Sequence, residues 1–232
     1  MITSAIHDNQ DAGEGKRGLA RFLIECHLCL IGNRQYWRSE WLFTRPGRAA
    51  STTQTRNLFM ARSGAVTFKG SPMTLAGEAV KVGQMAPDCT WHYFEGGLKK
   101  MTPADLKGKP TIISVVPSLD TPVCQTQTKK FSEQLASFGD KINAATVSLD
   151  LPFAMNRFCG AENIKCLKSL SDYWDRSFGQ NWGMLIEELK ILARGTFVLD
   201  AEGKVVYSEL VKEVAQEPNY DAALAALKGL VK

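Results

Sequence analysis

The chain has 232 residues, six of them cysteine, and a formal net charge of +4 at pH 7. This length is enough for one domain with a proper hydrophobic core and some excess chain. So small a charge does not indicate a nucleic acid or a membrane surface as a partner, and no apolar stretch is long enough to span a bilayer. The cysteines do not form the dense framework of a small secreted domain, which favours free thiols in a reducing, cytoplasmic compartment.

The first 64 residues differ from the rest in their basic residues. Before Met60 these are arginine with one exception, whereas lysine dominates after it. The segment shows no strand alternation, and its one apolar run, residues 19–31, lacks the uninterrupted core of a secretory signal. We therefore predict a poorly structured extension over residues 1–64 and a folded domain over residues 65–232. Met60 is an alternative start, so we expect residues 1–59 to be dispensable.

Four cysteines outside the main motifs have simple interpretations. Cys26 and Cys29 form a C-x-x-C pair, which can be redox-active beside a helix or can bind zinc together with a second pair. The chain has no second pair, and the flanking residues are apolar, so we predict no metal site. Cys89 and Cys166 are interpreted as structural or spare thiols.

From residue 66 onward the sequence alternates between strand and helix patterns. β-branched apolar runs predict buried strands, and amphipathic stretches predict helices. The predicted elements are, in chain order, a hairpin (66–70 with 73–77), a strand (90–94), a helical turn (102–106), a central strand (111–116), a helix (125–138), a strand (143–149), a helix (153–161), a strand (168–170), a helical turn (173–178), a second hairpin (196–200 with 204–209) and a final helix (219–230). The pattern predicts an α/β sandwich with a central mixed sheet flanked by helices and an N-terminal β-hairpin.

Residues 117–124 carry the most informative pattern of the chain. They follow the buried strand predicted at residues 111–116 and precede an amphipathic helix. Thr121 suits an N-cap and Pro122 suits the first helical position, so Cys124 falls in the first turn. The partial positive charge of a helix start favours a thiolate there. Without this context, Cys124 would be interpreted as a small buried hydrophobe, as most cysteines are.

Pro117, Thr121 and Cys124 fit the pattern Pro-x-x-x-Thr-x-x-Cys, which resembles the active-site loop of peroxiredoxins. Two further stretches, residues 148–162 and 192–200, narrow the resemblance to the thiol peroxidase branch, the atypical two-cysteine peroxiredoxins. These motifs are long and follow the family's order, and the similarity extends from the start of the folded domain to the C-terminus. The resemblance implies a thioredoxin-like fold, a homodimer, a hydroperoxide substrate, thioredoxin as electron donor, and no cofactor.

The resemblance also implies roles for five residues. Cys124 matches the peroxidatic cysteine, and Cys159 matches the resolving cysteine on the following helix. Thr121 and Arg194 match the hydroxyl and the guanidinium that bind the peroxide and stabilise the thiolate. Pro117 matches the proline that shields the thiolate from water. Taken alone, Arg194 would be interpreted as a surface or salt-bridged arginine and Thr121 as a plain helix cap.

These residue types suit peroxide reduction. A thiolate attacks one peroxide oxygen, the other oxygen leaves, and the resulting sulfenic acid condenses with a second thiol. Arg194 would meet the charge that develops on the leaving oxygen. We expect the reduced Cys124 and Cys159 to be too far apart for a disulfide, so that the first turns around both must unwind. Cys166 is the alternative partner, because it lies only seven positions after Cys159.

Three functions would use these cysteines. The first is a thiol-specific peroxidase that reduces hydrogen peroxide and organic hydroperoxides. The second is a thioredoxin-like disulfide reductase, which is disfavoured because Thr121 stands where a partner cysteine of Cys124 would be needed. The third is a redox sensor that passes its oxidation to a partner protein. Rapid turnover of peroxide with a recycling donor would separate the enzyme from the sensor.

Overall fold

A small antiparallel hairpin opens the part of the chain that the computed structural model describes, residues 61–231. Strand β1 (Arg62–Phe68) pairs with β2 (Ser71–Leu75) across a turn at Lys69 and Gly70, which both have positive φ. The turn therefore precedes the position that the sequence pattern indicated, because glycine readily adopts this backbone conformation.

The predicted extension and its C-x-x-C pair lie outside the described residues, apart from residues 61–64. Strand β1 begins at Arg62, so it includes residues that we assigned to the extension. The described residues fall within one compact unit that spans Thr55–Lys232. Among them, no helix is both long enough and apolar enough to cross a membrane.

The main sheet has seven strands in the order β4-β3-β7-β6-β5-β8-β9. Strand β6 pairs in parallel with β5 and β7, and the other neighbours pair antiparallel, so the sheet is mixed, as predicted. The strands are β3 (Trp91–Phe94), β4 (Leu98–Met101), β5 (Thr111–Val115), β6 (Asn143–Ser148), β7 (Lys168–Ser171), β8 (Gly195–Leu199) and β9 (Val205–Leu210). Strand β4 was missed, because a mostly exposed, lysine-bearing edge strand has no apolar alternation to detect.

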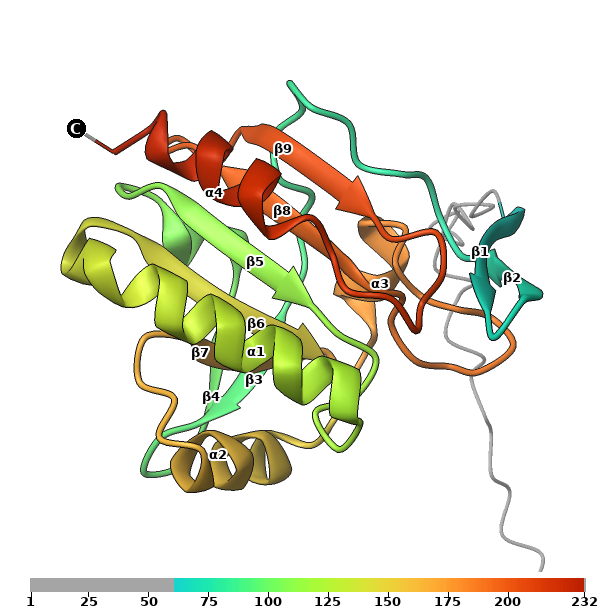
Figure 1. Cartoon of the computed structure of the whole chain (residues 1–232), viewed down its shortest axis with the longest axis horizontal. Coiled ribbons are helices and arrows are strands. Elements are labelled where there is room, and N and C mark those ends of the chain that lie inside the picture. Colours follow the sequence, from blue (N-terminus) through green and yellow to red (C-terminus); the bar gives the residue numbers. More distant parts are fainter. Residues whose placement is uncertain (1–60, 232) are drawn as a thin grey trace, which may run out of the picture. The chain divides into compact units, whose positions relative to one another are not determined.

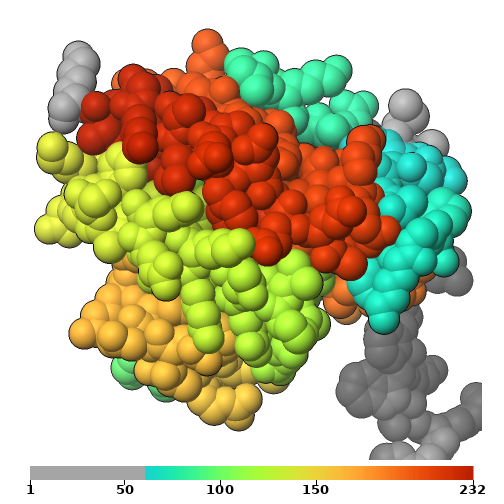
Figure 2. Space-filling model, viewed as in Figure 1, coloured from blue at the N-terminus to red at the C-terminus, as the bar shows by residue number. Residues whose placement is uncertain are grey.

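Helices α1 and α4 lie side by side over one face of the sheet, as Figures 1 and 2 show. Helix α2 contacts β7 and β3 near the sheet edge, and α3 contributes Phe178 to the core on the opposite face. The helical segments are η1 (Pro103–Leu106), α1 (Pro122–Leu135), η2 (Ala136–Lys141), α2 (Pro152–Ala161), α3 (Ser177–Asn181) and α4 (Tyr220–Lys228). Layers of helix over a mixed sheet form the predicted α/β sandwich, which has the thioredoxin-like arrangement.

The central strand β5 divides the core between the two faces of the sheet. All five of its residues are buried, and successive side chains point to opposite faces. Ile113 packs with the aromatic cluster of Trp91, Phe178 and Trp182, whereas Ile112 packs under α1 and α4. A third, small cluster lies where β5 ends and α1 begins, and it contains Cys124. The fold thus places this cysteine on a rigid strand–loop–helix junction.

Candidate active site

The loop between β5 and α1 is fixed by the carboxylate of Asp150. Asp150 accepts hydrogen bonds from the Ser118 hydroxyl at 2.8 Å, the Leu119 amide at 2.7 Å and the Ser148 hydroxyl at 2.9 Å. It follows strand β6, the parallel neighbour of β5, so the carboxyl ends of both strands meet at this loop. Sequence reasoning gave Asp150 no role, although an acidic residue directly after a parallel strand is a signal that could have revealed it.

Cys124 is the third residue of α1, and its side chain is completely buried. Two donors reach its sulfur: the Thr121 hydroxyl at 2.8 Å and the Nη2 group of Arg194 at 3.3 Å. Its apolar neighbours are Val116, Leu119 and Met155, the last of which comes from α2. The sulfur is therefore enclosed by apolar side chains and approached by two polar groups.

Thr121 is the N-cap residue of α1 and Pro122 the first helical residue, as the sequence indicated, but the Thr121 hydroxyl caps no backbone amide. It lies 2.8 Å from the Cys124 sulfur and 3.0 Å from the Ser118 carbonyl oxygen. A hydroxyl has one proton, so it can donate to only one of these acceptors at a time. A thiolate at Cys124 would draw that proton toward the sulfur.

Arg194 is only 2% exposed and directly precedes strand β8. The register pairs Val115 with Gly195, which brings Arg194 level with the loop that follows β5. A side chain at Gly195 would collide with the Glu209 carbonyl, 2.4 Å from the Cβ position, so glycine keeps β9 close at this point.

The buried guanidinium of Arg194 donates three hydrogen bonds. Nε binds the Val214 carbonyl at 2.9 Å, Nη1 binds the Gln127 side-chain oxygen at 2.5 Å, and Nη2 points to the Cys124 sulfur. Within residues 61–231, no carboxylate forms an ion pair with Arg194. A buried charge is costly unless its donors are satisfied, and the acceptors here are the Val214 carbonyl, the Gln127 oxygen and the Cys124 sulfur.

Gln127 is a site residue that sequence reasoning missed. It is fully buried, accepts from Arg194, and donates through Nε2 to the Ser114 hydroxyl at 2.8 Å. It follows Cys124 by three residues, so both side chains lie on the same face of α1. A polar residue three positions after the predicted nucleophile, on the same face of the predicted helix, was the available signal.

Pro117 is buried immediately after β5, and the hydrogen bonds that reach the Cys124 sulfur come from other residues. Together with Ser118 it lines a cavity of about 310 Å³. Tyr173, Arg176 and Ile191 line the same cavity. Pro117 is thus a loop residue that borders this cavity.

Cys159 lies in the last turn of α2, as the eighth of ten residues, and is 8% exposed. Its sulfur is 3.1 Å from the Ser169 hydroxyl, and its apolar neighbours include Ile164 and Leu167. Burial raises the pKa of the Cys159 thiol, and the hydrogen bond with Ser169 opposes this in part. The turn around Cys159 that we expect to unwind is thus the last turn of α2, and its unwinding stays a prediction.

Cys124 and Cys159 are both free thiols and belong to different apolar clusters. Phe158 packs against both clusters. Among the described residues, no group of three histidine, cysteine or acidic side chains could hold a metal ion.

Comparison with known proteins agrees with this geometry. The Redoxin family model matches residues 81–224. The chain is 52% identical over 167 residues to a thiol peroxidase of Bacillus subtilis (strain 168), covering 72% of this chain and 98% of that protein. It is 48% identical over 165 residues to a thiol peroxidase of Staphylococcus aureus (strain MRSA252), covering 71% and 98%.

A solved structure is also similar. The crystal structure of a peroxiredoxin-like protein from Aquifex aeolicus matches with a TM-score of 0.67 and 40% identity, over 73% of this chain and 99% of that one. The chain therefore belongs to the redoxin family, as a thiol peroxidase of the peroxiredoxin type.

Proposed function

We propose that the thiol peroxidase activity of this chain resides at Cys124, with Thr121 and Arg194 as its peroxide-binding donors. The observation that supports this assignment is the convergence of both donors on one buried sulfur, at 2.8 and 3.3 Å. Pro117 closes the loop beside the cysteine and limits access of water. The donors are already positioned, so little reorganisation is needed when charge develops.

The first chemical step forms a sulfur–oxygen bond and breaks the peroxide bond. The Cys124 thiolate attacks one peroxide oxygen, and the other leaves as hydroxide or alkoxide, which takes a proton to become water or an alcohol. The Arg194 guanidinium stabilises the leaving oxygen, and the Thr121 hydroxyl orients the substrate because it can donate and accept. Cys124 is left as a sulfenic acid.

Cys159 resolves this sulfenic acid. Its thiolate attacks the Cys124 sulfur, a disulfide forms, and hydroxide leaves as water. The last turn of α2 must open first, because Phe158 packs against both apolar clusters that hold the cysteines. Such local opening requires little free energy at a helix end, where few backbone hydrogen bonds are lost.

Thioredoxin is the proposed reductant, which places the protein in the cytoplasm, where dithiol reductants are maintained. A thioredoxin thiolate attacks the disulfide and returns both cysteines to thiols by exchange. The resemblance of the chain to thiol peroxidases supports this donor.

The chain also forms a homodimer in this proposal. Large apolar side chains are exposed at Leu151 (52%), Trp174 (68%) and Leu189 (39%). Each adjoins in sequence a residue that lines the cavity at Pro117. Exposed apolar groups gathered around a polar opening are typical of protein interfaces. Sedimentation equilibrium of Trp174→Ser should show a weaker dimer than wild type, and an unchanged dimer would assign the interface elsewhere.

A turnover assay tests the proposed function against the sensor alternative. Peroxide is supplied in excess with thioredoxin, thioredoxin reductase and NADPH, and NADPH oxidation is followed. The enzyme oxidises many equivalents of NADPH per chain, and Cys124→Ser oxidises none above background. If wild type reacts only once and is not recycled by thioredoxin, the chain acts as a sensor.

A further inference from the structure

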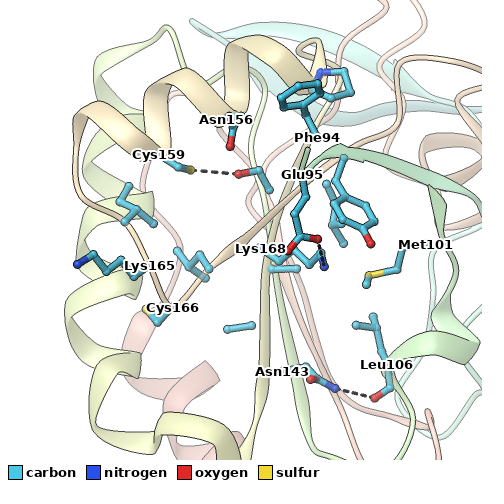
Figure 3. Close-up of a pocket in the computed structure, with 18 of the residues that line it drawn as sticks. Phe94, Glu95, Met101, Leu106, Asn143, Asn156, Cys159, Lys165, Cys166 and Lys168 are labelled. Atoms are coloured by element: carbon cyan, nitrogen blue, oxygen red, sulfur yellow. Dashed lines mark hydrogen bonds and ion pairs between the residues drawn. The ribbon is translucent and has the colours of Figure 1, made fainter. Parts of the chain in front are cut away.

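Cys166 lines the same cavity as Cys159, and the mechanism above does not use it. The cavity has a volume of about 540 Å³. Figure 3 shows both cysteines on one side of it, Cys159 on α2 and Cys166 on the segment that leads to β7. Cys166 is partly exposed, whereas Cys159 is buried. Two thiols of unequal accessibility therefore share one opening.

Cys166 follows Cys159 by seven positions, and the chain turns back between them. After α2 the backbone reverses at Asn163, whose φ is 53°, and the Ile164 amide donates to the Cys159 carbonyl at 2.9 Å. Cys166 is two residues further on, so its Cα is at most about 7 Å from that of Ile164. A disulfide needs Cα atoms within about 7 Å, and Cys166 lies outside the helices and strands. The relay therefore requires a shift of this segment that brings the Cα atom of Cys166 to within about 7 Å of that of Cys159.

The contacts that hold Cys166 are weak ones. Its thiol donates to the Ser132 carbonyl at 3.0 Å and lies 3.4 Å from the Ser132 hydroxyl. A thiol is a poor hydrogen-bond donor, so releasing it requires little free energy. Ser132 belongs to α1, the helix that carries Cys124, and Cys166 follows α2, the helix that carries Cys159.

We propose that Cys166 is a third catalytic thiol, which takes the disulfide over from Cys124 and presents it in this cavity. The relay rests on the proposed function, because it begins from the Cys124–Cys159 disulfide. The Cys166 thiolate attacks the Cys159 sulfur, a bond forms between Cys159 and Cys166, and the bond to Cys124 breaks. Cys124 leaves as a thiolate, and the proton of Cys166 passes to solvent. The exchange involves no net oxidation or reduction, so no further oxidant or reductant is needed.

The site favours this direction of attack. Thiol–disulfide exchange is faster when the leaving sulfur is stabilised as a thiolate. Thr121 and Arg194 donate to the Cys124 sulfur, whereas Cys159 has one hydroxyl beside it and apolar neighbours. Attack on Cys159 therefore expels the better leaving group. The relay frees Cys124 for a second peroxide and exposes the disulfide to the reductant at the partly exposed Cys166.

Peroxide stoichiometry without a reductant tests the relay. Full-length wild type should consume about two equivalents per chain in the rapid phase, one to form the disulfide and one to oxidise the released Cys124. Cys166→Ser keeps a donor for the Ser132 carbonyl but cannot relay, so it should consume about one equivalent. Cys89→Ala is the matched control, because Cys89 is buried in a different cluster, and it should behave like wild type.

Peptide mapping identifies the bonds. Trypsin cleaves after Lys165, so Cys159 and Cys166 fall in different peptides and their disulfide is visible directly. In wild type we expect Cys124–Cys159 early and Cys159–Cys166 later, with Cys124 again open to alkylation. In Cys166→Ser only Cys124–Cys159 should form.

Two results would overturn the relay, and they differ in what else they reject. If wild type keeps Cys124–Cys159 and consumes as much peroxide as Cys166→Ser, the relay is wrong and the proposed function stands. If Cys166→Ser forms no Cys124–Cys159 link, Cys159 is not the resolving cysteine and the relay is rejected together with that role.

Discussion

Cys124 and Cys159 are both buried free thiols at helix ends, yet their surroundings differ in kind. Cys124 lies at the start of α1 and receives hydrogen bonds from Thr121 and Arg194. Cys159 lies at the end of α2, where its sulfur contacts the Ser169 hydroxyl and burial raises the pKa of its thiol.

This difference in surroundings supports different proposed roles for the two thiols, Cys124 as the nucleophile and Cys159 as the resolving thiol. A helix start and a guanidinium stabilise a thiolate, whereas a helix end and apolar packing stabilise a neutral thiol. In the proposed mechanism Cys124 reacts in the closed fold, and Cys159 reacts only when its helix end opens. Such an order would protect the proposed resolving thiol from peroxide until a sulfenic acid is present.

The largest expected effect comes from replacing Cys124, the thiol that receives two hydrogen bonds. Cys124→Ser should lower kcat/KM for hydrogen peroxide by about 10³-fold or more, because a serine hydroxyl is a far weaker nucleophile than a thiolate. Stopped-flow peroxide consumption measures it, with Cys89→Ala as the control that keeps activity. Substantial activity in Cys124→Ser would place the nucleophile elsewhere.

The next effect concerns the guanidinium. Arg194→Lys keeps the charge, but one ammonium group cannot reach Val214, Gln127 and Cys124 together as the planar fork does. We expect kcat/KM for peroxide to fall by about 10²-fold, the usual loss for one positioned donor. An unchanged rate constant in Arg194→Lys would remove this residue from the mechanism.

Gln127 tests the role of the guanidinium indirectly. Its side chain accepts a hydrogen bond from Arg194 and forms none with the Cys124 sulfur. Gln127→Met should lower kcat/KM by about tenfold, since the guanidinium loses one of its three acceptors. Gln127→Glu places a carboxylate on Arg194 that competes with the Cys124 sulfur for the guanidinium, so it should lower the rate at least as far. Wild-type activity in both variants, with only their unfolding free energies changed, would indicate a purely structural role.

The pH dependence of disulfide formation tests the effect of burial on the Cys159 thiol. The closed fold raises the pKa of Cys159, so it holds the proton more tightly than the opened chain. Its stabilisation of the closed form is complete below the ordinary thiol pKa of about 8.5 and declines as pH rises above it. Loss of sulfenic acid should therefore accelerate several-fold between about pH 8 and 9.5. Rapid-quench trapping measures this rate, and a flat profile would contradict the assigned burial effect.

The sequence predicted the elements that carry strong periodicity, and it predicted Cys124 from local chemistry. The strand–cap–proline pattern placed Cys124 in the first turn of α1, where the structure has it. Arg194 could be named only through the family resemblance, because its approach to Cys124 depends on the β5–β8 register, which no local pattern encodes. Gln127 and Asp150 were missed for the same reason, since their partners come from other elements.

The surroundings of Cys159 show a further limit. The predicted helix 153–161 already placed Cys159 near its end, but the neighbours of this thiol depend on how α2 packs over β7 and β3. Likewise, the shared cavity of Cys159 and Cys166 arises from the chain reversal at Asn163, which the sequence did not reveal.

The division of tasks between the two cysteines is tested most directly by a single-turnover measurement on Cys159→Ser. Reduced full-length protein is mixed with one equivalent of peroxide, and both peroxide loss and trapping of the Cys124 sulfenic acid are followed. We predict a peroxide step within about twofold of wild type, followed by a persistent sulfenic acid that over-oxidises with more peroxide. A peroxide step slowed by about tenfold or more, or a sulfenic acid that disappears as fast as in wild type, would contradict this account.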